Sequence, residues 1–219
     1  MVVRAGNARW RLAHAALLAG VLTGCAEGAE NGDGKRASAS ATATRAGAEV
    51  AERGGTIGAP GSACELPVTF GIAEEWTAES VDAGAASDGG EVADALLHQG
   101  PVTAACEVDA KPAGHIGFLR VWTGEPGDAD ARTVLKEFVA AEGATSKAKY
   151  HDFRTGSLKG VEVEYLYTSK LLDETKPERA LAVTTPNGPV VVHLGGLDSG
   201  EHQAMLPAYE LAKRTLRTA

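Results

Sequence analysis

The sequence changes character at Cys64, and this change limits how much of the chain can fold. From Ala26 to Ser62 it consists mainly of Gly, Ala, Ser, Thr and Glu, with Val50 and Ile57 as the only large aliphatic residues. Such a segment buries too little apolar surface to offset the entropy lost on ordering. The sequence therefore predicts a tether over 25–62 that is disordered, followed by a single folded domain over 63–219.

The folded part carries the alternating patterns of antiparallel strands. In 160–168, Val and Tyr side chains at odd positions alternate with Glu162 and Glu164, which predicts a strand with one buried and one solvent-exposed face. Asn187-Gly188 between two apolar runs and the turn Lys111 to Gly114 each predict a hairpin. The expected strands are 68–72, 102–108, 116–122, 147–154, 160–168, 180–185 and 190–194.

Apolar residues recur at helical spacing in 130–142, where Asp128 or Asp130 is the expected N-cap and Gly143 the expected stop. A short helix is also expected over 91–99. Helices placed between sequential antiparallel strands predict an α+β fold, in which helices cover a curved antiparallel sheet.

A closing helix is expected to reach Arg217. Pro207 lies inside its apolar pattern, so this helix either kinks there or has its regular part begin at Pro207.

The N-terminus has the features of a secretory signal. Arg4, Arg9 and Arg11 precede an apolar run that is too short to span a bilayer, and the run ends in Leu22-Thr23-Gly24-Cys25. These four residues resemble the lipobox of bacterial lipoproteins. The resemblance implies a signal peptide over 1–24, a diacylglyceryl group on Cys25, and anchorage on the extracytoplasmic face of the cell membrane.

Lipidation of Cys25 would leave Cys64 and Cys106 as an even pair in an oxidising compartment, which favours a disulfide between them. Two separate buried thiols are the alternative.

Removal of residues 1–24 leaves 18 Lys and Arg against 29 Asp and Glu, a formal charge of −11. An acidic surface argues against nucleic acid as a partner, because phosphates require a basic face. Contact with the membrane is therefore expected through the lipid on Cys25 alone.

Several residues invite a chemical interpretation. Asp198 and Ser199, with His193 and His202 nearby in sequence, form the alternative hypothesis of a surface hydrolase or metal-dependent enzyme. Asp198 or Ser199 as the N-cap of the last helix is the simpler explanation. No catalytic residue, metal site or cofactor is predicted from these patterns.

Two further groups of side chains have a structural explanation and a functional one. Glu162 and Glu164 suit acid–base chemistry or calcium, although the outer face of a strand accounts for both. The aromatic side chains of Trp76, Trp122, Tyr165 and Tyr167 suit a ligand groove, although core packing accounts for most of them.

The element order resembles the PsbP-like fold, shared by LpqN- and LpqT-type envelope lipoproteins and the extrinsic photosystem II protein PsbP. The resemblance rests on the strand from Val68 running into Trp76, the helix 130–142 and the closing helix to Arg217. Ala73-Glu74-Glu75-Trp76 lacks the Pro-x-Gly-Trp form often found there. The resemblance transfers no functional residue, and it implies a binding or scaffolding module more than an enzyme.

The leading hypothesis from sequence is therefore a lipid-anchored envelope lipoprotein of actinobacterial type that binds a partner protein or an envelope component without catalysis. A carrier of small ligands is a second alternative, and it requires an apolar cavity lined by Trp122 and the tyrosines.

Overall fold

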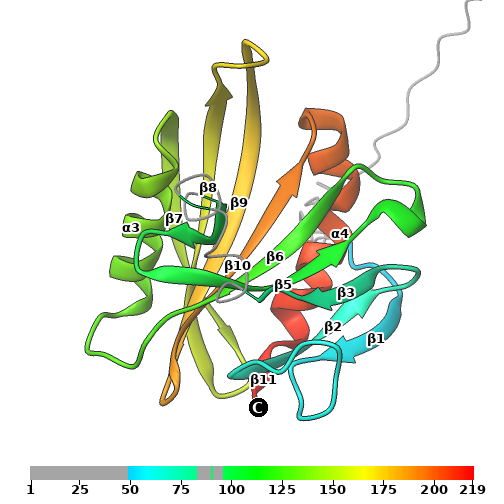
Figure 1. Ribbon diagram of the computed structural model, residues 1–219, viewed down its shortest axis with the longest axis vertical. Coiled ribbons are helices and arrows are strands. Elements are labelled where there is room, and N and C mark those ends of the chain that lie inside the picture. The colour runs from blue at the N-terminus through cyan, green and yellow to red at the C-terminus, as the bar shows by residue number, and fades with distance from the viewer. Residues whose placement is uncertain (1–48, 83–89, 91–95) are drawn as a thin grey trace, which may run out of the picture. The chain divides into compact units, whose positions relative to one another are not determined.

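A central antiparallel sheet organises the computed structural model, which describes residues 49–82, 90 and 96–219 (Figure 1). Its strand order is β3-β5-β6-β10-β9-β8-β7, and β4 (His98–Gln99) pairs with β5 outside this path. The strands are β3 (Thr77–Ser80), β5 (Val102–Asp109), β6 (Gly117–Thr123), β7 (Thr145–Thr155), β8 (Leu158–Ser169), β9 (Glu174–Thr185) and β10 (Gly188–Gly196).

The middle strand, β10, is buried on both faces. Val190, Val192 and Leu194 pack into one apolar cluster, whereas Val191 packs into another. Because side chains alternate across a strand, the two clusters lie on opposite faces of the sheet. The fold therefore has three layers, with the sheet in the middle.

Helix α3 (Ala131–Glu142) covers one face. The Asp130 side chain caps it by accepting a hydrogen bond from the Thr133 amide at 2.7 Å, as predicted, and Gly143 follows its end at φ 92°. Its buried side chains pack against β8, β9 and β10. They are Ala131, Val134, Leu135, Phe138 and Val139.

Helix α4 (Ser199–Thr215) covers the opposite face together with a small second sheet. That sheet has the order β1-β2-β11, from β1 (Arg53–Ile57), β2 (Val68–Ala73) and β11 (Arg217–Thr218). Tyr209 is the largest fully buried side chain in this layer. The helix continues through Pro207, whose carbonyl accepts a hydrogen bond from the Ala51 amide at 3.0 Å.

The α+β class and the antiparallel sheet are thus confirmed, but several boundaries were wrong. The closing helix, expected to reach Arg217, ends at Thr215, because Arg217 pairs with β2 as part of β11. The expected tether ended at residue 62, whereas β1 pairs with β2 over 53–57, because a paired strand needs backbone partners more than large side chains. His98–Gln99 is a strand within the expected helix 91–99, of which 91–95 lie outside the described residues. Strand β9 begins at Glu174 instead of 180, and the second sheet was not predicted.

The predicted disulfide is present between Cys64 and Cys106, with a Cα–Cα distance of 5.9 Å. A β-bulge lies between Ala104 and Cys106, so even-numbered side chains of β5 face α3 before the bulge and face α4 after it. Ala104 therefore packs on the α3 face and Cys106 on the α4 face. The bridge ties β5 to the segment that leads into β2.

None of the helices in the described part of the chain combines the length and the hydropathy needed to cross a bilayer.

We expect the double substitution Cys64→Ser/Cys106→Ser to lower the free energy of unfolding by about 4 kcal/mol, because the bridge closes a loop across 42 positions and restricts the unfolded chain. Urea denaturation of wild type and variant measures the difference. A loss below about 1 kcal/mol would contradict a stabilising role for the bridge.

Candidate functional site

A cleft of about 640 Å³ opens on the α3 face of the central sheet, beside the C-terminal end of the helix. Its lining comes mainly from β6, β9 and β10, from the β5–β6 connection, and from Glu142 at the end of α3, with one residue each from β4 and β8. Helix α3 covers the sheet mainly over β8 and β9. The cleft is therefore a part of the sheet face that the helix leaves open.

Aromatic side chains and a glycine shape the cleft. Phe118 and Trp122 project from β6, and Tyr167 stands at the end of β8. The Arg120 guanidinium lies 4.5 Å from the centre of the Phe118 ring and 5.6 Å from that of Trp122. A side chain at Gly195 would have its Cβ 3.0 Å from the Phe118 ring, so the absence of a side chain there leaves space for the ring.

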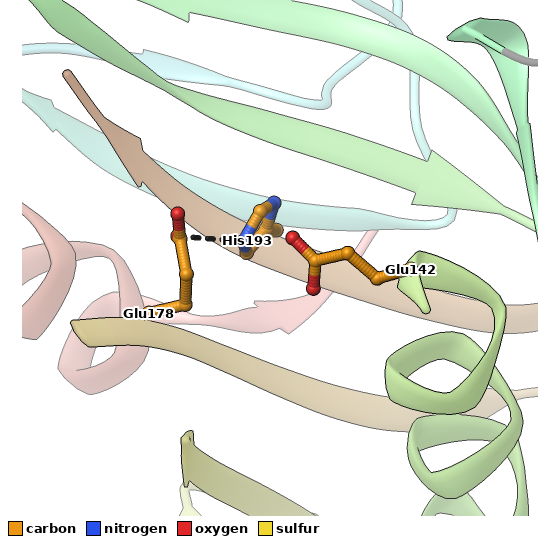
Figure 2. Close-up of side chains that lie close together, drawn as sticks. All are labelled: Glu142, Glu178 and His193. Carbon is orange, nitrogen blue, oxygen red and sulfur yellow. Dashed lines mark hydrogen bonds and ion pairs between the residues drawn. The ribbon is translucent and has the colours of Figure 1, made fainter. Parts of the chain in front are cut away.

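Three ionisable side chains from different elements meet in the cleft (Figure 2). His193 Nε2 of β10 lies 3.0 Å from Glu178 Oε2 of β9. The Glu142 carboxylate reaches the same place from α3, and the candidate ligand atoms of the three residues lie within 4.8 Å of one another. We call these residues, Glu142, Glu178 and His193, the cleft cluster.

Neighbouring groups hold the cleft cluster in place. Lys176 Nζ lies 2.8 Å from Glu178 Oε1 and also donates to the Gly196 carbonyl. The Tyr165 hydroxyl lies 3.3 Å from His193 Nε2. Phe138 of α3 packs edge-on against the His193 ring, with ring centres 5.5 Å apart. Because Glu142 follows Phe138 by four residues, both project from the same side of α3.

Burial and pairing shift the pKa values of the cleft cluster in different directions. Burial alone would lower the pKa of His193, but the hydrogen bond and charge of Glu178 raise it above the usual 6.5. Burial alone would raise the pKa of Glu178, but His193 and Lys176 lower it below 4.5. Burial raises the pKa of Glu142, against the opposing charge of His193. Glu178 and His193 therefore form a buried ion pair.

Two buried polar atoms in the cleft lining have no hydrogen-bond partner. They are Glu142 Oε2 and Trp122 Nε1, and the Trp122 residue is only 3% exposed. An unpaired buried polar group costs about 1–3 kcal/mol. The cleft thus offers one acceptor and one donor to whatever enters it.

The four residues of the hydrolase hypothesis do not come together in one site. They are Asp198, Ser199, His193 and His202. The Asp198 carboxylate caps α4 by accepting from the Glu201 amide at 2.9 Å, and Ser199 is the first residue of the helix. Of the four residues, only His193 lines the cleft. His202 is buried on α4, where burial lowers its pKa to about 4.

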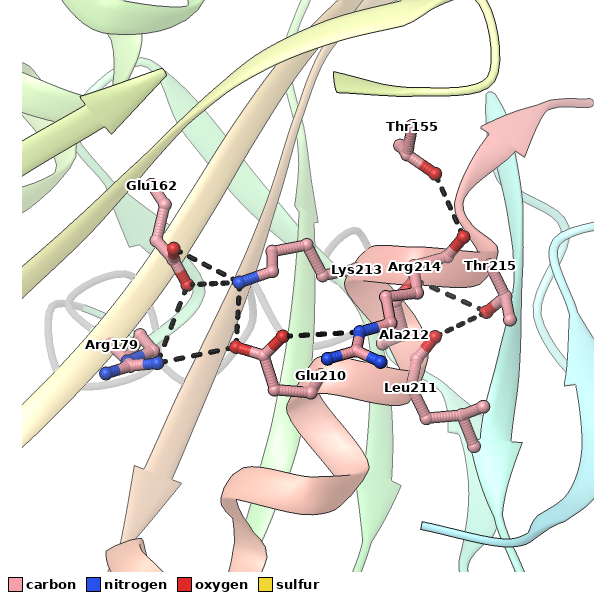
Figure 3. A network of polar contacts seen from close by, with 9 residues as sticks. All are labelled: Thr155, Glu162, Arg179, Glu210, Leu211, Ala212, Lys213, Arg214 and Thr215. Carbon is pink, nitrogen blue, oxygen red and sulfur yellow. Dashed lines mark hydrogen bonds and ion pairs between the residues drawn. The ribbon is translucent and has the colours of Figure 1, made fainter. Parts of the chain in front are cut away.

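Glu162 was expected on a solvent-exposed face, and this expectation was wrong. It lies beneath α4 at 8% exposure, where its carboxylate receives two hydrogen bonds from Lys213 Nζ, at 3.1 and 3.2 Å (Figure 3). Lys213 also binds Glu210 at 2.7 Å, and Arg179 joins Glu162, Glu164 and Glu210. Oppositely charged partners satisfy these carboxylates, so the network fastens α4 to the sheet.

The aromatic residues divide between the two explanations. Trp122 and Tyr167 line the cleft, as the ligand-groove hypothesis required, whereas Tyr165 is buried beneath it and Trp76 packs in the core of the opposite face. Glu142 and Glu178 were not recognised from the sequence. The signal was present, because Glu142 continues the apolar stripe of α3 and Glu178 continues the buried positions Ala180 and Ala182 of β9.

Comparison with known proteins adds a family and one structural likeness. A family model described as uncharacterised lipoprotein matches residues 34–216. No curated protein matches the chain. The solution structure of cyanobacterial PsbP (CyanoP) from Synechocystis sp. PCC 6803 is similar at 12% identity and a TM-score of 0.49, over 79% of this chain and 96% of that one. At that score and identity, the likeness carries no argument about activity or partners.

We expect Glu178→Gln to bring the pKa of His193 below 6.5, because burial remains while the carboxylate that stabilises the imidazolium is lost. NMR titration of the imidazole in buffer with EDTA measures this shift. Glu164→Gln, on the opposite face of the sheet, is the control and should leave the titration of His193 unchanged. An equal pKa in wild type and Glu178→Gln would contradict the ion pair.

The same pair makes stability depend on pH. The lowered pKa of Glu178 adds stability that is lost as pH falls below 4.5, and the raised pKa of His193 adds stability that is lost as pH rises above 6.5. The pair therefore stabilises the fold most between these two values.

Proposed function

Because this chain belongs to a family of uncharacterised lipoproteins, we propose that it is a lipid-anchored binding protein of the cell envelope, whose cleft captures a small amphipathic ligand without chemical change. A diacylglyceryl group is attached to the Cys25 thiol, removal of residues 1–24 then makes Cys25 the N-terminus, and the domain faces away from the cytoplasm. The family match and the lipobox support this part of the proposal.

The cleft is the observation that carries the binding function. Its volume, about 640 Å³, falls within the range of about 300–1,000 Å³ usual for small-molecule sites. Aromatic walls with a few polar groups suit a ligand that is part apolar and part hydrogen-bonding. Trp122 Nε1 and Glu142 Oε2 are the atoms that such a ligand would pair.

The rim of the cleft supports the same ligand class. Ile116 and Leu197 line the cleft, yet their side chains are 58% and 48% exposed. Their backbones are joined by a 3.0 Å hydrogen bond from the Leu197 amide to the Ile116 carbonyl. An apolar part of a ligand can therefore rest on this rim while its polar part reaches Glu142.

Binding without catalysis is supported by the position of the candidate nucleophile. Ser199 begins a helix whose cap is Asp198, and the cleft that holds His193 is not lined by Ser199. A serine nucleophile requires a base within hydrogen-bond reach. This favours a carrier or sensor of a ligand over a hydrolase.

We expect Cys25→Ala to remove the protein from the membrane fraction or to leave residues 1–24 attached, because the thiol is the lipidation site. Fractionation with mass spectrometry of the N-terminal peptide tests this, and wild type should show a diacylglyceryl adduct. Membrane retention of a processed Cys25→Ala protein would contradict the anchor.

We expect Gly195→Leu to reduce ligand occupancy at least tenfold, because the new side chain enters the cleft against Phe118. The measurement is native mass spectrometry of protein extracted from the membranes of its producing cells. Gly127→Leu is the matched control, since a Cβ there meets nothing within 4 Å. A wild-type protein with no bound molecule, or equal occupancy in a folded Gly195→Leu protein, would contradict ligand capture in the cleft.

A further inference from the structure

The cleft cluster has the residue types, the spacing and the exposure of a metal site. We propose that Glu142, Glu178 and His193 bind one divalent transition-metal ion of the Zn²⁺ type within the cleft. This inference extends the proposed function, and it rests on that function only because the ion would lie in the same cleft as the ligand.

The distances suit a single ion. Two ligands at the tetrahedral angle on a Zn²⁺ ion with bonds of about 2.1 Å are about 3.4 Å apart, only slightly more than a hydrogen-bonded pair. Glu178 Oε2 and His193 Nε2 are 3.0 Å apart, and the candidate ligand atoms of all three residues lie within 4.8 Å of one another. Small side-chain rotations at Glu142, which ends a helix, would bring its oxygen to the remaining ligand position.

The donor set indicates the class of ion. One imidazole nitrogen and two carboxylate oxygens suit first-row divalent ions such as Zn²⁺, whereas Ca²⁺ and Mg²⁺ take oxygen ligands only. Three protein ligands also leave coordination positions open toward the cleft, as in catalytic and transport sites. A ligand carboxylate, phosphate or water oxygen would complete the coordination.

The surroundings hold the ligands in the way that known metal sites do. Lys176 Nζ binds the second oxygen of Glu178, and Phe138 packs against the ring of His193. Such outer contacts fix the orientation of metal ligands. Glu178 and His193 are thus already oriented, and an ion bound at His193 Nε2 would displace the proton that His193 shares with Glu178.

Two unpaired atoms point independently to a missing partner. Glu142 Oε2 is buried with no hydrogen-bond donor, and an ion would satisfy it. Trp122, at 3% exposure, lines the same cleft with an unpaired Nε1–H, which suits a water or ligand oxygen held by the ion.

The test is Zn²⁺ binding to the full chain after treatment with a chelator, measured by isothermal titration calorimetry and by metal analysis after dialysis. We expect one Zn²⁺ per chain, and affinity at least tenfold lower in Glu142→Gln and in His193→Gln. Glu164→Gln removes a half-exposed carboxylate from the opposite face and should bind as wild type does. Circular dichroism verifies that each variant is folded.

A second readout does not depend on affinity alone. Co²⁺ in place of Zn²⁺ should give visible absorption bands that Glu142→Gln shifts or abolishes while Glu164→Gln preserves them. Absence of stoichiometric Zn²⁺, or equal affinity and spectra in folded Glu142→Gln, would overturn the metal site. If the metal site is overturned but metal-free wild type still retains its native ligand, the proposed binding function stands. If neither Gly195→Leu nor Glu142→Gln lowers ligand occupancy, both the binding function and the metal site are contradicted.

Discussion

The position at which α3 ends determines where the central sheet leaves a cleft uncovered. Twelve residues make a helix about 18 Å long, and its apolar stripe buries only part of the sheet face. The stripe closes with Phe138 against Trp122 and His193. One turn later the helix places a carboxylate, Glu142, where another apolar side chain would have continued the core. The cleft and the cleft cluster both follow from the presence of a carboxylate at position 142 instead of an apolar side chain.

The sheet supports this arrangement at some cost in stability. Charges taken out of water are costly unless they are paired, and Glu178 is 3% exposed. Lys176 and His193 provide the pairing, one on each oxygen. On the other face, Lys213 pairs with Glu162 and Glu210, so the charges buried between α4 and the sheet are also compensated. One buried charged network fastens a helix, and the other faces a cleft.

Local patterns in the sequence predicted much of the sheet but little of the site. The cap at Asp130, the stop at Gly143 and the Asn187-Gly188 turn depend on near neighbours, so they could be read from the sequence. The disulfide was predicted by elimination among three cysteines. Strand β1 could not be predicted, because its Gly-rich segment is held by pairing with β2, a long-range contact. Burial of Glu162 depends on α4, some fifty residues away.

We propose that the cleft beside the end of α3 holds a ligand. The most direct measurement is an experimental structure of the protein purified, without chelator, from the membranes of the cells that make it. We expect a bound molecule between Phe118 and Trp122, with a polar atom within hydrogen-bond distance of Glu142 or of an ion that Glu142 holds. A cleft closed by these side chains, or occupied by disordered water alone, would show that the protein captures no ligand there.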